Sequence, residues 1–120
     1  MKILIVDDSR VMRSIVRRAL RQAGYGSHEV VEACDGKEGL CVYDNESPGL
    51  VLSDWNMPEM NGMEFLEKLR ADGANVPFVF ITTEWTPEQR ALATGAGACG
   101  LIVKPFSEQD VCSVLDTYLG

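Results

Sequence analysis

The sequence has no hydrophobic run long enough to cross a membrane. Its longest uninterrupted aliphatic or aromatic runs are four residues each, Ile3–Val6 and Phe78–Ile81, whereas a membrane-spanning helix needs about 20. Two aspartates directly follow the first run, which therefore does not resemble the apolar part of a secretory signal. These absences predict a cytoplasmic chain with no membrane segment.

Basic residues and metal-binding motifs are also scarce. Eleven Lys and Arg stand against eighteen Asp and Glu, for a net charge of −7, which argues against direct contact with nucleic acid because phosphate binding needs a positive surface. The single His and the four cysteines show no ligand spacing. In a chain without an export signal, we expect the cysteines to be reduced thiols in the core or half-buried. They are Cys34, Cys41, Cys99 and Cys112.

The composition is that of one globular domain. Hydrophobic residues make up 46% and charged residues 24% of the 120 positions, which excludes disorder and coiled coil. We find no repeat, linker or low-complexity tract, and we predict a single domain over residues 1–120.

Short apolar runs alternate with helical patterns five times. The predicted strands are Lys2–Val6, Val30–Ala33, Leu50–Ser53, Phe78–Thr82 and Leu101–Val103. The first predicted helix carries a buried stripe of Met12, Ile15, Val16, Ala19, Leu20 and Ala23. Asp35 is predicted to cap a second helix that runs to about Tyr43. The later helices are predicted from about Met63 to Arg70, from Pro87 to about Gly95, and from Ser107 onward.

Five strand–helix units predict a doubly wound α/β fold, in which helices cover both faces of a parallel sheet. The expected strand order is 2-1-3-4-5, that of the flavodoxin-like fold. Ligands of such sheets bind at the carboxyl ends of the strands.

Polar side chains follow four of the five predicted strands. Asp7 and Asp8 follow the first strand, Asp54 the third, Thr82 the fourth and Lys104 the fifth. In the order 2-1-3-4-5 these four strands are neighbours, and the second strand, which no such residue follows, is at the edge. The residues should therefore meet on one rim.

Three carboxylates on one rim would repel one another unless a cation is present. Carboxylates with room for water suit Mg²⁺, and a divalent cation with a lysine and a hydroxyl suits a phosphoryl group. One carboxylate could act as a nucleophile, since aspartyl phosphates are a known type of covalent intermediate. The alternative is that each aspartate only caps a helix.

The chain resembles the CheY-like receiver domains of bacterial two-component response regulators over nearly its whole length, and most closely the stand-alone chemotaxis type. The matching pieces are Asp7-Asp8, the segment 53–58 (SDWNMP), Asn61-Gly62, Thr82 and the segment 104–106 (KPF). The strand order assumed above is also this family's, so it is not independent support.

The resemblance implies that Asp54 accepts the phosphoryl group. It further implies that Asp7, Asp8, Asp54 and the backbone carbonyl of Asn56 hold Mg²⁺, that Lys104 pairs with the phosphoryl oxygens, and that Thr82 hydrogen-bonds to them. The Lys104–Pro105 bond is expected to be cis.

Other positions are implied to modulate the site. Asn56 and Glu84 flank it and influence how fast the acyl phosphate hydrolyses, and their combination resembles that of the chemotaxis type. Receivers usually carry Tyr or Phe where this chain has Leu101, so that part of the switch is altered. Trp85 is a candidate to take over some of the role.

The sequence therefore predicts a signalling switch rather than an enzyme that turns over an external substrate. The implied partners are a sensor histidine kinase or histidine phosphotransfer protein, and a downstream target that binds the fourth helix, fifth strand and fifth helix. The alternatives are the receiver portion of a larger regulator, for example a DNA-binding one, a phosphorelay intermediate and, less favoured, an Asp-nucleophile Mg²⁺ phosphatase. The adjacent Asp7-Asp8 pair speaks against the phosphatase, whose motif is Asp-x-Asp.

The first predicted helix concentrates positive charge. Residues 1–21 carry a net charge of +4 and the remainder −11. The arginines are predicted on the face opposite the apolar stripe, where a solvated face and a docking surface for the kinase are both open readings. They are Arg10, Arg13, Arg17, Arg18 and Arg21.

Overall fold

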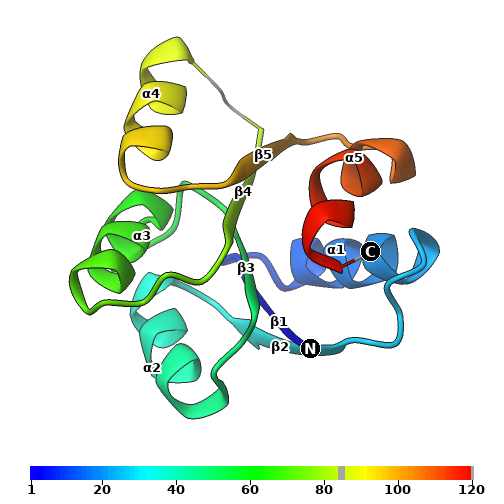
Figure 1. Ribbon diagram of the computed structural model, residues 1–120, viewed down its shortest axis with the longest axis horizontal. Coiled ribbons are helices and arrows are strands. Elements are labelled where there is room, and N and C mark those ends of the chain that lie inside the picture. The colour runs from blue at the N-terminus through cyan, green and yellow to red at the C-terminus, as the bar shows by residue number, and fades with distance from the viewer. Residues whose placement is uncertain (84–85, 120) are drawn as a thin grey trace.

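The computed structural model describes residues 1–83 and 86–119 and contains a parallel five-stranded sheet with five helices in the described part (Figure 1). The strands are β1 (Lys2–Val6), β2 (Glu29–Ala33), β3 (Leu50–Ser53), β4 (Phe78–Thr82) and β5 (Gly100–Val103). The helices are α1 (Arg10–Gln22), α2 (Gly36–Glu46), α3 (Gly62–Ala71), α4 (Pro87–Gly95) and α5 (Glu108–Leu119). The strand order is β2-β1-β3-β4-β5, which confirms the predicted fold class.

The element boundaries follow local signals closely. The side chain of Asp35 accepts a hydrogen bond from the Glu38 N–H and so caps α2, as predicted. This helix runs beyond the expected Tyr43 to Glu46, because the polar residues of its last turn carry no hydrophobic signal. It ends where Ser47 adopts a left-handed conformation with φ 48°.

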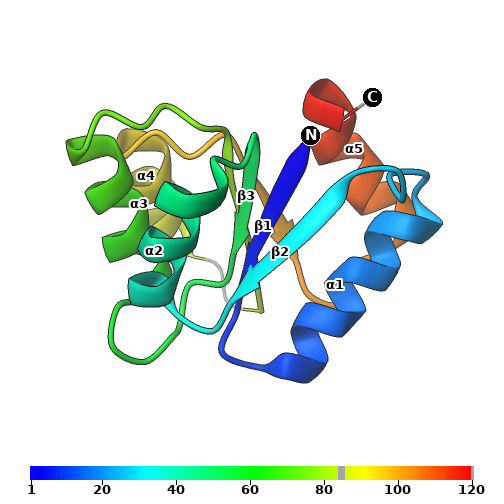
Figure 2. The same cartoon turned by 90° about the horizontal axis from the view of Figure 1, so that it is seen from below.

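The helices cover the sheet from two sides. Figure 2 shows α1 and α5 on one face and α2, α3 and α4 on the other. Along β1 the fully buried side chains alternate, so that Ile3 and Ile5 join one core while Leu4 and Val6 join the other. The three central strands are therefore buried on both faces, and the polar residues that follow them lie at the end of the sheet.

Two expectations about burial were wrong. Ile15 was expected in the buried stripe of α1, but it is 44% exposed, because only a narrow strip of this helix, centred on Val16 and Leu20, contacts the sheet beside α5. The cysteines were expected in the core or half-buried. Three of them are exposed, since other apolar residues of the strands and helices already fill both cores, and only Cys112 is half-buried. All four thiols are free.

No helix in the ranges 1–83 and 86–119 is long and apolar enough to cross a membrane.

Candidate functional site

The carboxyl ends of β1 and β3 bring three carboxylates together. The Asp54 N–H donates to the carbonyl of Val6 at 2.9 Å, and the Asp7 N–H donates to that of Ala33 at 3.1 Å, so the sheet pairing continues one residue past each strand. As a result, one carboxylate oxygen each of Asp7, Asp8 and Asp54 lies within 4.8 Å of the others. The predicted rim of acidic residues is present.

Asp7 is the buried member of the cluster, with 3% of its surface exposed. Its Oδ1 accepts the Ser9 N–H at 2.9 Å, and its Oδ2 accepts from Lys104 Nζ at 3.1 Å. Its backbone carbonyl accepts from Arg13 Nη1 at 2.6 Å. Each of its polar groups is thus engaged, whereas Asp8 is exposed to solvent.

Asp54 is half-buried between its neighbours. Its Oδ1 accepts the Trp55 N–H at 2.7 Å, and its Oδ2 lies 3.6 Å from Lys104 Nζ. Burial raises the pKa of Asp54 above its ordinary value, Lys104 acts in the opposite direction, and the charge of Asp7 raises it further. Lys104 therefore only partly offsets the cost of burying the Asp54 carboxylate, and an added cation would stabilise the charged form further.

A glycine lets α3 approach the site closely. Gly62 donates its N–H to the Trp55 carbonyl at 2.8 Å. A Cβ at this position would stand 2.1 Å from the Asp54 carbonyl oxygen and 2.9 Å from the ring of Phe80. The Asn61-Gly62 pair is therefore explained by packing: Asn61 caps α3 with a reciprocal capping box to Glu64, and Gly62 leaves room for the loop.

Thr82 and Lys104 complete the rim from β4 and β5. Thr82 is 1% exposed at the end of β4, and its carbonyl accepts the Lys104 N–H at 2.9 Å. The Lys104–Pro105 peptide bond is cis, as predicted. The side chain of Lys104 is 10% exposed and lies between two carboxylates, those of Asp7 and Asp54.

The residues predicted to modulate the site have different surroundings. Asn56 is exposed in the loop after β3. Leu101 is half-buried, stands opposite Phe80 in the β4–β5 pairing, and packs on the core beneath α3 and α4. Glu84 and Trp85 lie outside the described residues.

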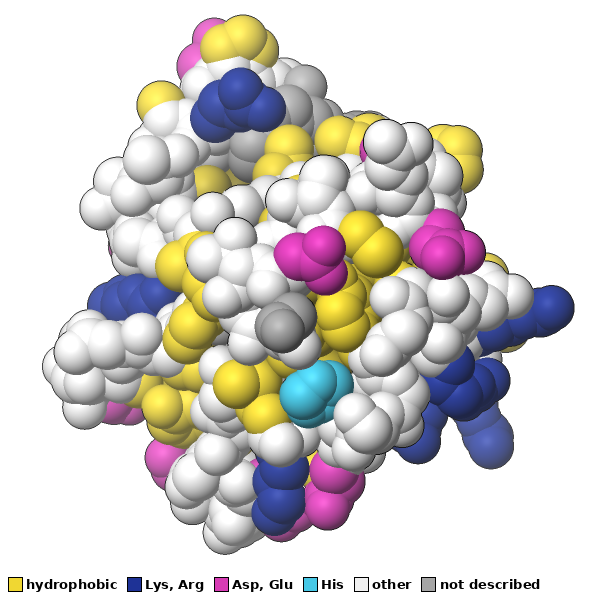
Figure 3. All heavy atoms as spheres, turned by 45° about the vertical axis from the view of Figure 1, so that its right-hand side comes forward, with side chains coloured by type: hydrophobic (Ala, Val, Ile, Leu, Met, Phe, Trp, Pro, Cys, Tyr) yellow, Lys and Arg dark blue, Asp and Glu magenta, His cyan; other side chains and the backbone are white. Residues whose placement is uncertain are grey.

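Sequence reasoning missed the role of two α1 arginines. Arg13 and Arg17 were placed on a face opposite the apolar stripe, but both turn toward β2 and share Glu32, at 2.8 Å and 2.6 Å. Arg13 is also the donor to the Asp7 carbonyl. The available signal was Glu32, a single charged residue between the apolar residues Val31 and Ala33 of β2, which suggests a basic partner. Figure 3 shows the basic side chains that gather over α1.

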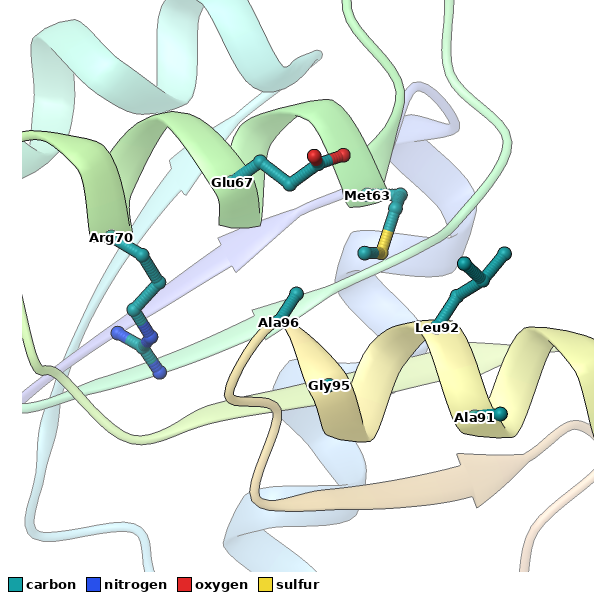
Figure 4. Close-up of a pocket in the computed structure, with 7 residues that line it drawn as sticks. All are labelled: Met63, Glu67, Arg70, Ala91, Leu92, Gly95 and Ala96. Atoms are coloured by element: carbon teal, nitrogen blue, oxygen red, sulfur yellow. The ribbon is translucent and has the colours of Figure 1, made fainter.

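A separate groove of about 530 Å³ lies between α3 and α4 (Figure 4). Its walls carry Met63 and Glu67 from α3 and Leu92 from α4. Arg70 lies at its end, where its guanidinium donates to the carbonyls of Ala74 and Gly97 at 2.9 Å and 2.8 Å. This groove brings together no cluster of carboxylates or nucleophiles, so the chemistry belongs to the acidic rim.

Comparison with known proteins decides the family. The model of the response regulator receiver domain matches residues 3–116. The chain belongs to the response regulator receiver family. This receiver is 41% identical to chemotaxis protein CheY1 of Helicobacter pylori, over 100% of this chain and 98% of that one. It is 39% identical to a CheY homologue of Campylobacter jejuni, over 100% and 93%.

Solved structures agree with this assignment. The receiver superimposes on Vibrio cholerae chemotaxis protein CheY4 with a TM-score of 0.86, at 36% identity and 98% coverage of each chain. A CheY-like receiver domain protein from Methanospirillum hungatei gives a TM-score of 0.85 at 30% identity, over 98% and 92%. The protein is a phospho-accepting signalling switch rather than a classical enzyme.

Proposed function

We propose that Asp54 accepts the phosphoryl group. The observation that carries this proposal is the position of Asp54, whose Oδ2 is 3.6 Å from Lys104 Nζ within a cluster of three carboxylates. Because Oδ1 is held by the Trp55 N–H at 2.7 Å, Oδ2 is the better candidate for the attacking oxygen.

We further propose that the acidic cluster holds Mg²⁺. The donor set fits, because Asp7, Asp8 and Asp54 offer hard oxygen ligands within 4.8 Å of one another, and the exposed side of Asp8 leaves room for water. The backbone carbonyl of Asn56 is the fourth proposed ligand. When bound, Mg²⁺ supplies positive charge to the carboxylates and to phosphoryl oxygens.

The transfer step needs a carboxylate, a donor and charge compensation. Asp54 Oδ2 attacks phosphorus, the new O–P bond forms as the P–N bond to the donor's phosphohistidine breaks, and the imidazole leaves with the bonding electron pair. Lys104 is within reach to pair with the phosphoryl oxygens. The Thr82 hydroxyl, at the end of the neighbouring strand, is proposed to donate to one of them.

Hydrolysis removes the phosphoryl group. Water attacks phosphorus as the O–P bond to Asp54 breaks, which regenerates the Asp54 carboxylate and releases inorganic phosphate. We propose that Asn56 and Glu84 set the rate of this step. We also propose that Leu101, which stands opposite Phe80 in the β4–β5 pairing, weakens the conformational change on β5 that follows a movement of Thr82, because leucine lacks the aromatic ring usual at this position.

The phosphoryl donor is proposed to be a histidine kinase or a histidine phosphotransfer protein that docks beside Lys104. An apolar hollow of about 300 Å³ opens there, lined by Met12 and Ile15 of α1 and by Phe106. Val11 is 68% exposed on the same helix. Replacing Val11 and Ile15 by Gln should slow transfer from such a protein and leave phosphorylation by acetyl phosphate unchanged.

Output is proposed through α4, β5 and α5. Leu92 and Val103 are 58% and 44% exposed there, and among the described residues of these three elements Arg90 is the one basic side chain.

The relatives named as chemotaxis proteins support a role in chemotaxis. We propose that residues 1–120 act as one receiver unit in the cytoplasm, which the four free cysteines support.

Intact mass after incubation with acetyl phosphate tests the proposal. The wild type should gain one phosphoryl adduct with Mg²⁺ and none without it, and Asp54→Asn should gain none. Ser53→Ala is a matched control next to the acceptor, and it should still be phosphorylated. An adduct on Asp54→Asn, or none on the wild type with Mg²⁺ bound, would contradict Asp54 as the acceptor.

A further inference from the structure

The orientation of two neighbouring carboxylates depends on the peptide that joins them. The carbonyl of Asp7 belongs to the peptide unit between Asp7 and Asp8, and it accepts from Arg13 Nη1 at 2.6 Å. A planar peptide has no internal freedom. Fixing this carbonyl therefore fixes the direction in which the backbone enters Asp8, the exposed member of the cluster.

Arg13 is itself held in place. Its Nε donates to Glu32 Oε1 at 2.8 Å, and its side chain is 15% exposed. Glu32 directly precedes Ala33, whose carbonyl accepts the Asp7 N–H at 3.1 Å. The peptide units on both sides of Asp7 are therefore anchored to the end of β2, one directly and one through the guanidinium.

Arg17 provides an internal comparison. It lies one turn further along α1 and donates to the other oxygen of Glu32 at 2.6 Å. Its hydrogen bond goes to Glu32 rather than to the β1–α1 loop. Arg13 and Arg17 thus carry the same charge, share the same carboxylate, and differ in contact with Asp7.

From this geometry we propose that Arg13 is a positioning residue for the magnesium site: its guanidinium orients the Asp7–Asp8 peptide so that both carboxylates converge. The inference rests on the magnesium site proposed above. Groups that orient metal ligands affect affinity without touching the metal. Arg13 is an unexpected residue for this task, because its positive charge lies close to the proposed cation site and by itself would repel Mg²⁺.

That charge makes the proposal testable by the sign of the effect. If Arg13 acted only through its charge, removing it would strengthen cation binding. If it only supported the fold, removing it would lower stability and leave affinity unchanged. If it orients the peptide, removing it weakens Mg²⁺ binding in spite of the electrostatic gain.

The experiment compares Arg13→Met with Arg17→Met, because methionine keeps much of the apolar stem and removes the charge and the donors. Both variants carry Trp85→Phe, so that Trp55 is the single tryptophan. The backbone N–H of Trp55 donates to the Asp54 carboxylate, which places this residue beside the proposed metal site. Titration with Mg²⁺ is followed by Trp55 fluorescence and by calorimetry. Far-UV circular dichroism before each titration establishes that the metal-free protein is folded, and Arg13→Gln serves as a second variant.

Arg13→Met should raise the Kd for Mg²⁺ by about tenfold or more, and Arg17→Met should change it by less than about twofold. The Kd for Ca²⁺ should rise less than that for Mg²⁺, since Ca²⁺ tolerates irregular ligand geometry and Mg²⁺ does not. Equal effects of the two variants, or tighter Mg²⁺ binding by Arg13→Met, would refute the inference alone. Failure of the unsubstituted protein to bind Mg²⁺ would refute the metal site together with it.

Discussion

Lys104 donates a hydrogen bond to Asp7 at 3.1 Å, although the two residues are 97 positions apart in the chain. Their side chains are 10% and 5% exposed. This pair joins the end of β5 to the end of β1 across two intervening strands. A lysine and a buried aspartate therefore neutralise one another at the place where a phosphoryl group is proposed to arrive.

Replacing Lys104 by Met should leave the buried Asp7 charge without its cation. We expect the free energy of unfolding at pH 7 to fall by about 3 kcal/mol without Mg²⁺. Mg²⁺ should restore more stability in this variant than in the wild type, because it supplies the missing positive charge. Urea denaturation with and without Mg²⁺ measures both effects. Lys37→Met, on the exposed side of α2, is the control and should be nearly neutral.

Asp54→Asn should stabilise the metal-free protein at neutral pH. Burial raises the pKa of Asp54, so the folded state holds the proton more tightly than the unfolded state. Stability is therefore lost as the pH rises from the unfolded pKa, about 4, through the folded pKa. The amide of the variant does not ionise. Its advantage in urea denaturation should be largest at pH 7 and shrink toward pH 4; a variant less stable than wild type at pH 7 would contradict this.

Glu32→Gln should have the opposite pH dependence. Burial alone would raise the pKa of Glu32, but hydrogen bonds from Arg17 and Arg13 outweigh it, and the pKa is lowered. The stabilisation is present above the unfolded pKa and is lost as the pH falls through the folded pKa.

The Glu32→Gln variant should therefore lose about 1 kcal/mol at pH 7, given the partial exposure of the pair, and little at pH 3. Chemical denaturation across this range measures the difference, and high salt should reduce it. Glu29→Gln is the control, because Glu29 is 61% exposed and stands 3.8 Å from Lys2. Equal losses in the two variants would argue against a special role for the shared carboxylate.

Gly62→Ala should destabilise the fold by about 3 kcal/mol. The added Cβ would meet the Asp54 carbonyl oxygen, a backbone atom that cannot swing aside as a side chain can. Gly95→Ala in α4 is the matched control. A Cβ there has no neighbour within 4 Å, and alanine's better helix propensity should add up to about 1 kcal/mol. Thermal and urea unfolding of both variants measures the contrast.

The fold was predictable because its signals are local. The strands β1, β3 and β4 are short apolar runs bounded by polar residues, and their predicted ends match the structure. Burial on the helices was harder to predict. Ile15 continues a regular apolar pattern, but how much of α1 the sheet covers depends on where α5 packs, which no local pattern contains.

The candidate site was predictable for a topological reason. Side chains that follow neighbouring parallel strands meet at one edge, so their positions in the sequence were enough to gather Asp7, Asp54 and Lys104. The Arg13–Glu32 contact was not predictable, because it depends on the register between α1 and β2. A charged residue on a helix gives the same local signal whether it faces water or a partner.

The two cores of the receiver also differ in their aromatic content. Trp55 contacts Phe80, Phe80 contacts Phe78, and Phe78 contacts Phe65, with ring centroids 4.8 to 5.5 Å apart, all on the face covered by α2, α3 and α4. The α1–α5 face is mainly aliphatic, with Tyr25 as its buried aromatic residue. Near-ultraviolet circular dichroism will therefore follow mainly the packing of this aromatic layer, with a smaller contribution from Tyr25, while backbone signals follow both layers equally. Loosening of the two layers at different stages of unfolding would appear as two non-coincident transitions.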